Sequence, residues 1–355
     1  MRSAPAVWLI SLADLRYRAR RFVIGVIVSS LVLALSLLLA GIGANFQNEA
    51  RRTLRAFHAD AWVVPNGDNG PFRSSDTVRQ SLTGTIRAIP GVTNAQPVAM
   101  LRATLRANTV KDADVMGIVP GQFTTPPIVA GRAPTGPGEI TLNRSMQVRL
   151  GTTVHLDGMS LRVVGLTSKL TYLANTPTAY IVLSDAQRLA YGGQPLAATI
   201  AVQGHPKVMP PGLTVLSNAE VKASMLEPMK NPIQLIRNIE ILLWAVAAMV
   251  IGSVVYLSTM DRTRDLAVLK ATGSTTRSLF AGLTVQAAVL TSAAYAMGVA
   301  LSVVLAGRMP TPSEIPTSSY ALLIGVCVMV VGAASLSGLR RSVHVEPALA
   351  FGAAQ

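Results

Sequence analysis

Four stretches of the chain carry no charged side chain for twenty or more residues, and each is strongly apolar. They are Phe22–Asn48, Ile241–Met260, Ser278–Gly307 and Ile315–Leu339. A hydrocarbon core of ~30 Å is crossed by about 20 helical residues, so each stretch is long enough to span a bilayer. The pattern predicts an α-helical polytopic membrane protein, with four transmembrane helices at residues 22–45, 238–260, 278–307 and 315–339.

The polar stretch between the first two apolar runs is long enough for a folded domain. Short runs of strand-forming residues alternate there with Gly and Pro, which mark turns. Strands are expected at 61–64, 92–106 (with a break at Pro97), 114–119, 139–142, 152–156, 161–166, 179–183, 199–202 and 213–216. Short helices are expected at 79–89 and 143–149. This predicts a mixed α/β extracytoplasmic domain, residues 61–216, inserted between helices 1 and 2.

Two helical segments are expected to join this domain to the membrane as stalks, at residues 46–60 and 217–237. In the first, Phe46, Ala50, Leu54 and Phe57 recur at helical spacing. The second opens with Ser217-Asn218-Ala219-Glu220, which has the form of a capping box. Its prolines, at 228 and 232, predict a bend there.

Charge predicts the orientation in the membrane. Residues 1–21, 261–277 and 340–355 together hold eleven Lys/Arg and four Asp/Glu. The positive-inside rule therefore places both termini and the 261–277 loop in the cytoplasm. Residues 1–21 form an expected amphipathic helix on the membrane surface, with its arginines near anionic lipid headgroups. A cleaved signal peptide is the alternative, but the apolar run is longer than the usual apolar segment of one.

The sequence lacks the usual marks of an enzyme. It contains no G-x-x-x-x-G-K-[ST] phosphate loop, so the chain itself is not expected to hydrolyse ATP. Its histidines, His58, His155, His205 and His344, are scattered, and no metal site or catalytic residue is expected. Asp112 and Asp114 flank one alanine at a strand start, where such acids are usually solvated. The apolar spans carry no ionisable group, which argues against an ion-driven pump. Nucleic acid is not an expected partner for a domain outside the membrane.

The loop between the second and third runs carries a longer motif. It resembles the loop of FtsX/MacB-type ABC transporter permeases, roughly Glu-Arg-x-x-Glu-Ile-Gly-x-Leu-Lys-Ala-x-Gly-Ala. The positions in register are Asp261, Arg262, Asp265, Leu266, Leu269, Lys270, Ala271 and Gly273. This chain departs from the pattern with Asp at 261 and 265, Leu266 for Ile, Ala267 for Gly and Ser274 for Ala. An ordinary solvated loop is the plainer interpretation of this segment.

Other segments resemble the same family in the same order along the chain. Ala61-Trp62-Val63-Val64 resembles its first outer strand, and residues 139–154 resemble a strand, helix and hairpin of MacB-type outer domains. The tail at 344–350 resembles the family's ending, with Glu346 where Asp is usual. The resemblance implies an outer α/β domain with an inserted part, which we place near residues 108–190.

The family resemblance also implies partners. Its coupling helix docks on a separate cytosolic ABC ATPase subunit, which binds ATP and Mg. In this chain Leu266 and Leu269 would enter an apolar groove, with Arg262, Arg264, Asp265 and Lys270 setting orientation. The loop spans residues 261–277, and the ATPase is expected to dock on Asp261–Ser274. A second permease copy or a paralogue would pack through spans one and two. Small residues that allow such packing are Gly25, Ser29, Ala248 and Gly252, although small residues are common in any membrane helix.

The sequence therefore predicts the permease subunit of an ABC transporter in a bacterial cytoplasmic (inner) membrane. ATP hydrolysis on another chain would drive export or handover of a substrate by the extracytoplasmic domain. The alternative is an FtsX-like signalling scaffold that regulates an envelope hydrolase or another extracytoplasmic protein. A receptor without an ATPase is a third hypothesis. The substrate is left open.

Overall fold

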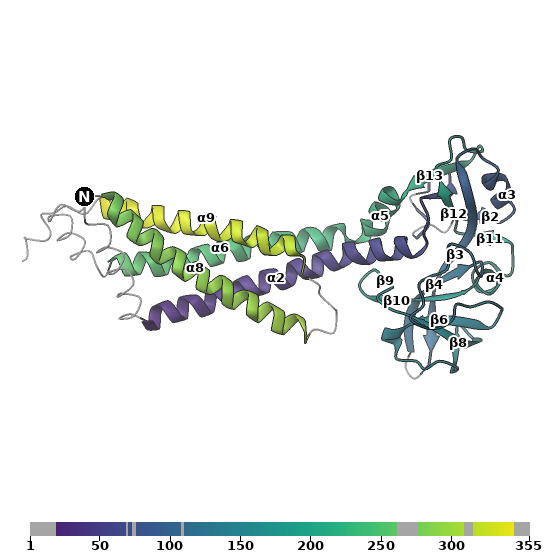
Figure 1. Cartoon of the computed structure of the whole chain (residues 1–355), viewed down its shortest axis with the longest axis horizontal. Helices are drawn as coiled ribbons and strands as arrows, with labels where there is room; N and C mark the ends of the chain where they lie inside the picture. Colours follow the sequence, from purple (N-terminus) through teal and green to yellow (C-terminus); the bar gives the residue numbers. More distant parts are fainter. Residues whose placement is uncertain are drawn as a thin grey trace, which may run out of the picture. The chain divides into compact units, whose positions relative to one another are not determined.

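The computed structural model describes residues 19–68, 70–72, 76–107, 110–260, 276–308 and 315–343. The described chain divides into two compact units (Figure 1). The helical unit takes the described residues up to Asn45 and from Pro232 onward. The second unit, Phe46–Asn231, contains the β-strands, and we call it the strand-rich domain.

Four long helices carry the apolar runs. They are α2 (Ala19–Ala56), α6 (Lys230–Met260), α8 (Thr276–Ala306) and α9 (Thr317–Val343). By length and composition, all four could cross a membrane. The predicted architecture is confirmed: four long apolar helices, with the mixed domain between the first and the second. Both α2 and α6 continue beyond the expected spans, and α2 ends eleven residues after the last residue of the helical unit, Asn45.

The helical unit packs through small and polar residues as well as apolar ones. A Cβ on Gly298 of α8 would lie 3.1 Å from the Ser30 carbonyl oxygen and 3.2 Å from Leu33 Cβ, so α8 approaches α2 closely there. The Trp244 indole Nε1 donates to Ser36 Oγ at 2.9 Å. These contacts follow the rule that small residues let membrane helices approach and polar side chains pair between them.

The strand-rich domain is built on one mixed sheet of eleven strands. The main path runs in the order β13-β1-β12-β3-β4-β10-β6-β8-β5, while β7 pairs with β3 and β8, and β9 pairs with β10. The β4–β10 and β6–β8 pairs are parallel and the others antiparallel. The strands are β1 (Ala61–Pro65), β3 (Val92–Arg106), β4 (Val110–Ile118), β5 (Ala130–Gly131), β6 (Glu139–Asn143), β7 (Thr153–Leu156), β8 (Met159–Thr167), β9 (Thr171–Tyr172), β10 (Thr176–Val182), β12 (Thr199–Gly204) and β13 (Leu213–Ser217). Two further strands, β2 (Val78–Arg79) and β11 (Leu196–Ala197), pair with each other.

The long strand β3 joins the two halves of this sheet. Its residues up to Val98 pair with β12, and those from Ala99 onward pair with β4. Each half has its own apolar core. One is centred on the buried Ile140, Leu142 and Leu156, and the other on the buried Val63, Ile86 and Ile200. A third cluster, around the aromatic residues Phe57, Trp62 and Tyr180, contains residues of both halves. In this sheet β1 lies between β12 and β13, so strands from opposite ends of the domain are neighbours (Figure 1).

Most of the expected strands are present, and the Asp157-Gly158 hairpin is confirmed. Both turn residues have positive φ, 44° and 89°, as a tight hairpin between β7 and β8 requires. Pro97 does not interrupt β3, and it lies opposite Ile200. The two-residue strands β2, β5, β9 and β11 were not expected, because so short a run carries no periodic signal.

Short helices complete the domain: α3 (Leu82–Arg87), α4 (Leu183–Tyr191), α5 (Asn218–Leu226), and the 3-10 turns η1 (Arg144–Met146) and η2 (Glu227–Met229). The capping box is confirmed, because Ser217 Oγ accepts from the Glu220 N–H while Glu220 Oε2 accepts from the Ser217 N–H. Helix α4 was not expected. Pro228 lies in η2, where the helix is interrupted, whereas Pro232 lies in the first turn of α6, which it does not break.

Candidate functional site

The segment predicted to contact the ATPase lies outside the described residues. This covers Asp261, Arg262, Arg264, Asp265, Leu266, Leu269, Lys270 and Gly273, and also the N-terminal segment to residue 18 and the tail from 344. Their assignment stays a prediction from the sequence.

The residues predicted to pack a permease dimer lie in the helical unit with different surroundings. Ser29 is fully buried within the single chain, and a Cβ on Gly25 would meet Val254 Cγ2 at 2.8 Å. Ala248 is half-buried, and a Cβ on Gly252 would meet nothing within 4 Å. Gly25 and Ser29 thus serve contacts inside one chain, while Gly252 faces open space. Packing between two copies remains a prediction.

The first stalk is fixed into the strand-rich domain by a buried carboxylate. Glu49, on the part of α2 that belongs to this domain, is 1% exposed. Its Oε1 accepts from Thr171 Oγ1 and from the Asn175 backbone N–H, both at 3.0 Å. One helical turn further on, Thr53 Oγ1 donates to the Thr171 carbonyl at 3.0 Å. The α2 end is therefore bonded to the segment around β9.

The second stalk is tied to the same domain through Asn218, at the start of α5. The Trp62 indole Nε1 donates to Asn218 Oδ1 at 2.8 Å, and Asn218 Nδ2 donates to the Ala59 carbonyl at 2.8 Å. Lys222 Nζ also donates to Gln47 Oε1 of α2 at 3.0 Å. Both stalk segments therefore contact the aromatic core around Trp62.

A cleft of about 400 Å³ opens beside this aromatic core, within the strand-rich domain. Two cross-strand pairs of β3 and β4, Met100 with Met116 and Arg102 with Asp114, contribute to its lining. Phe72 and Tyr172 line it too, with their rings stacked at 5.5 Å and 19° apart. The remaining lining residues are Pro71, Leu101, Val115, Leu173 and Pro228.

Asp114 is the acidic residue among those that line this cleft. Burial raises its pKa to about 6, Arg102 acts to lower the pKa and Asp112 acts to raise it further. Its Oδ2 is buried and has no hydrogen-bond partner among the described residues. The Arg102 side chain is 64% exposed, and its Nε lies 3.9 Å from Asp112 Oδ2. The cleft therefore holds a carboxylate with one buried oxygen to which no described residue donates a hydrogen bond.

The expectation that Asp112 and Asp114 are both solvated was right for Asp112 and wrong for Asp114. Asp112 is 60% exposed, whereas Asp114 lies two residues further into β4, beside the cleft. Sequence reasoning missed the cleft because its walls come from segments far apart in the chain.

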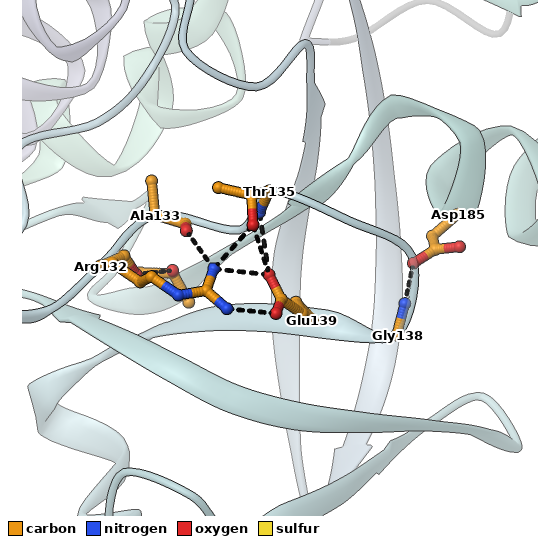
Figure 2. A network of polar contacts seen from close by, with 7 residues as sticks. Arg132, Ala133, Thr135, Gly138, Glu139 and Asp185 are labelled. Carbon is orange, nitrogen blue, oxygen red and sulfur yellow. Dashed lines mark hydrogen bonds and ion pairs between the residues drawn. The ribbon is translucent and has the colours of Figure 1, made fainter.

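A polar network at the other end of the domain is structural in character. Figure 2 shows the Arg132 guanidinium paired with Glu139 and donating to Thr135 Oγ1 and the Ala133 carbonyl. The hydrogen bond from Arg132 is the main cause that lowers the pKa of Glu139 to about 2. Nearby, the Gly138 N–H donates to the buried Asp185 Oδ2 at 2.8 Å (Figure 2). The Arg132 and Glu139 bonds close the loop between β5 and β6, and the Gly138–Asp185 bond ties this loop to α4.

The described residues contain no group of three or more His, Cys, Asp and Glu side chains that could hold a metal ion. The cleft, the two stalk attachments and the long helices are thus the features that bear on function.

Comparison with known proteins assigns both parts of the chain. Residues 239–347 match the model described as "FtsX-like permease C-terminal", and residues 23–213 match the "MacB-like periplasmic core domain". An uncharacterised ABC transporter permease of Mycobacterium tuberculosis (strain ATCC 25618 / H37Rv) is 36% identical over 343 residues, which cover 96% of this chain and 98% of that protein. A second one from the same strain is 36% identical over 344 residues, with the same coverage.

Solved structures resemble part of the chain. The periplasmic region of MacB from Actinobacillus actinomycetemcomitans is 16% identical, covers 49% of this chain and 96% of its own, and has a TM-score of 0.37. The extracellular domain of the transporter YknZ from Gram-positive bacteria is 16% identical, covers 42% of this chain and 84% of its own, and has a TM-score of 0.33.

The two matching family models together cover most of the sequence, including the four long helices and the strand-rich domain. The similarity to the mycobacterial permeases extends over nearly the full length of both chains. The chain is a multi-pass membrane protein, and it belongs to the FtsX-like family of ABC transporter permeases, the non-catalytic membrane subunits, with a MacB-like periplasmic core domain.

Proposed function

We propose that this permease transmits the work of a separate cytosolic ATPase to its strand-rich domain, which exports or hands over a substrate outside the cytoplasmic membrane. The observation that supports this best is the continuity of α2. This one helix belongs to the helical unit up to Asn45 and to the strand-rich domain from Phe46. Its end is fastened by Glu49 and Thr53 to the β9 segment. A helix held at its end by buried bonds can transmit displacement into the domain.

The ATPase would dock on the cytoplasmic loop at residues 261–277. Leu266 and Leu269 would enter an apolar groove of the ATPase, and Arg262, Arg264, Asp265 and Lys270 would set the orientation. ATP and Mg would be bound by that partner. Two permease copies, or this chain and a paralogue, would pair through spans one and two. Gly252 suits such a contact because a neighbouring helix can approach it closely.

The test is a double charge reversal, Arg264→Glu with Asp265→Arg, in the full chain. The wild-type permease is purified from its native membrane and any nucleotide-hydrolysing subunit that accompanies it is identified. The variant is expected to lose that subunit while its insertion in the membrane is unchanged. A matched control reverses an adjacent pair of opposite charges in the strand-rich domain, Lys111→Glu with Asp112→Lys. This control variant should retain the ATPase subunit. Equal retention by both variants would contradict the docking assignment.

Orientation can be tested in the same membranes. We place both termini in the cytoplasm and residues 61–216 outside. In a Cys327→Ser background, a cysteine in place of the exposed Val208 should react with a membrane-impermeant maleimide on intact cells. A cysteine at Ser3 should react after the membrane is opened. The reverse pattern would overturn the proposed orientation.

A signalling scaffold shares these features and differs in what the strand-rich domain binds. A protein partner that is held by residues 61–216 and is activated by ATP turnover would favour signalling. The cleft beside Phe72 and Tyr172 favours transport or handover, because its volume suits a small molecule.

A further inference from the structure

The inner wall of the cleft combines a carboxylate with apolar and aromatic surface. Asp114 lies beside Met116 on β4 and opposite Arg102 on β3. Burying a carboxylate costs free energy unless hydrogen bonds or opposite charges compensate it. Here Oδ2 is buried without a hydrogen-bond partner among the described residues. The protein therefore carries a cost at Asp114 that a bound cation could offset.

Among the described residues, Arg102 faces Asp114 across the β3–β4 pair, but its position argues against a tight ion pair. The Arg102 side chain is largely exposed, and its Nε lies 3.9 Å from Asp112 Oδ2. Arg102 thus lies at the rim and shares its charge with a second acid. Asp112 is also largely exposed and does not line the cleft. Because nothing in the described part of the chain hydrogen-bonds Asp114 Oδ2, we take this oxygen as the position for a ligand.

The apolar walls restrict the rest of the ligand. Phe72 is held in place by edge contacts with Phe57 and Trp62, at ring distances of 6.3 and 5.9 Å. Tyr172 stacks on Phe72, and the Tyr172 hydroxyl donates to the Phe72 carbonyl at 3.4 Å. These rings form a fixed aromatic wall. Met100 and Met116 have flexible side chains that adapt to different shapes. Such walls favour a flat apolar or aromatic body.

We propose that this cleft binds a protonated amine joined to an aromatic or flat apolar body, with the amine on Asp114 and the body against Phe72, Tyr172, Met100 and Met116. The ammonium group donates to the Asp114 carboxylate, while the aromatic rings also attract its positive charge. The further statement that this ligand is the transported substrate rests on the proposed function. The statement that the ligand binds in the cleft is independent of it.

The test measures binding to the full-length permease in detergent at pH 7.5, by calorimetry, with three probes that share one ring. Tryptamine carries an ammonium group, 3-ethylindole is neutral and indole-3-propionate is an anion. We expect tryptamine to bind at least tenfold more tightly than the other two. Equal binding of all three, preference for the anion, or absence of tryptamine binding would overturn the proposal.

Variants locate the site. Asp114→Asn should weaken tryptamine roughly 10- to 100-fold, as expected for loss of a partly buried charged hydrogen bond. Asp114→Glu keeps the charge and should recover most of the affinity. Asp112→Asn removes the same charge from an exposed neighbour and should change affinity less than threefold. If Asp114→Glu weakens tryptamine binding as much as Asp114→Asn does, the assignment is wrong. It is also wrong if Asp112→Asn weakens the binding more than Asp114→Asn does.

A separate readout distinguishes this proposal from the proposed function. The midpoint of thermal unfolding is measured first for each variant. A variant that does not bind tryptamine but unfolds at or above the wild-type temperature has lost the binding site and not the fold. Tryptamine is then added to the permease with its ATPase subunit. Binding with no change in ATPase rate keeps the site and rejects its role in transport. The Arg264→Glu, Asp265→Arg double variant is expected to lose the ATPase subunit and still bind tryptamine. This variant therefore tests the docking of the ATPase separately from the binding site in the cleft.

Discussion

Glu49 on α2 and Thr171 on β9 are 122 positions apart in the sequence, yet the Thr171 hydroxyl donates to the Glu49 carboxylate at 3.0 Å. The Asn175 N–H donates to the same oxygen. This is where the continuation of the first apolar helix is bonded to the sheet, and Glu49 is almost fully buried there. The Glu49 side chain therefore accepts both of these hydrogen bonds between α2 and the β9 segment.

We predict that Glu49→Ala destabilises the strand-rich domain by about 2–4 kcal/mol, because two hydrogen bonds to a buried charged acceptor are lost and two donors are left without it. Glu49→Gln keeps one oxygen acceptor and should cost less. The apparent thermal midpoint of the purified permease measures both. Glu227→Ala is the matched control, since its exposed pair with Lys230 should contribute little. A midpoint for Glu49→Ala equal to that of Glu227→Ala would contradict the anchoring role.

Asp114 should make stability depend on pH. Its pKa is raised by burial from 3.8 to about 6 in the folded chain, so the folded state binds the proton more tightly than the unfolded one. Stability therefore decreases as pH rises from about 4 to about 6, by on the order of 2–3 kcal/mol, and stays lower above that range. Asp114→Asn removes the ionisation, with Arg102 and Asp112 still facing the position.

We accordingly expect the Asp114→Asn midpoint to exceed that of the wild type at pH 7.5, and the difference to disappear near pH 4. Thermal unfolding at the two pH values measures it. Asp112→Asn, at an exposed site, should leave the midpoint nearly unchanged at both. A lower midpoint for Asp114→Asn at pH 7.5 would show that the carboxylate is a stabilising group instead.

Glu139 should act in the opposite direction. Its pKa is lowered from 4.5 to about 2, mainly by the hydrogen bond from Arg132. A depressed carboxyl pKa stabilises the folded state above pH 4.5, and this contribution is lost as pH falls through about 2. Glu139→Gln should therefore lower the midpoint at pH 6 and have less effect at pH 3. An equal effect at both values would mean that the charge of Glu139 is not what matters.

Close packing of α8 on α2 predicts a strong effect at Gly298. Any larger side chain there must move against the Ser30 carbonyl and Leu33 Cβ, at 3.1 and 3.2 Å from the added Cβ. Gly298→Leu should destabilise the helical unit by about 1–3 kcal/mol. Gly325→Leu on α9 is the control, because a Cβ there meets nothing within 4 Å. Midpoints and size-exclusion profiles in detergent compare the two, and equal profiles would contradict the close α8–α2 approach.

The sequence predicted features that have a local cause. Uncharged runs predict the long helices, Ser217 and Glu220 predict the capping box, and Asp157-Gly158 predicts the β7–β8 hairpin. Helix α4 was missed: the segment after β10 carries the signal of a helix end at Gly192, which adopts the left-handed conformation, but its start at Leu183 has no side-chain cap.

The candidate site could not be predicted in the same way. The cleft forms only when Phe72, the β3–β4 pairs and Tyr172 come together, and no spacing in the sequence records that. The environments of Asp112 and Asp114 differ because the second faces the cleft and the first faces solvent, although both lie on β4. Glu49 lies in the predicted first stalk, and nothing in its local sequence indicates that it is buried. Its role depends on a loop more than a hundred residues away.

The pairing of β1 with β12 has a consequence for biosynthesis. Val63 and Thr199, which share a hydrogen bond across this pair, are 136 residues apart. At a synthesis rate of ~5–20 residues per second, β1 waits roughly 7–27 s for its first partner strand to be made. During that interval the wholly apolar segment Ala61–Val64 lacks both of the strands that pair with it in the folded domain. The nascent domain thus depends on a strand that is synthesised much later, β12, to bury β1. Substitutions that slow the pairing of β12 with β1 should lower the amount of folded protein without changing the folded structure.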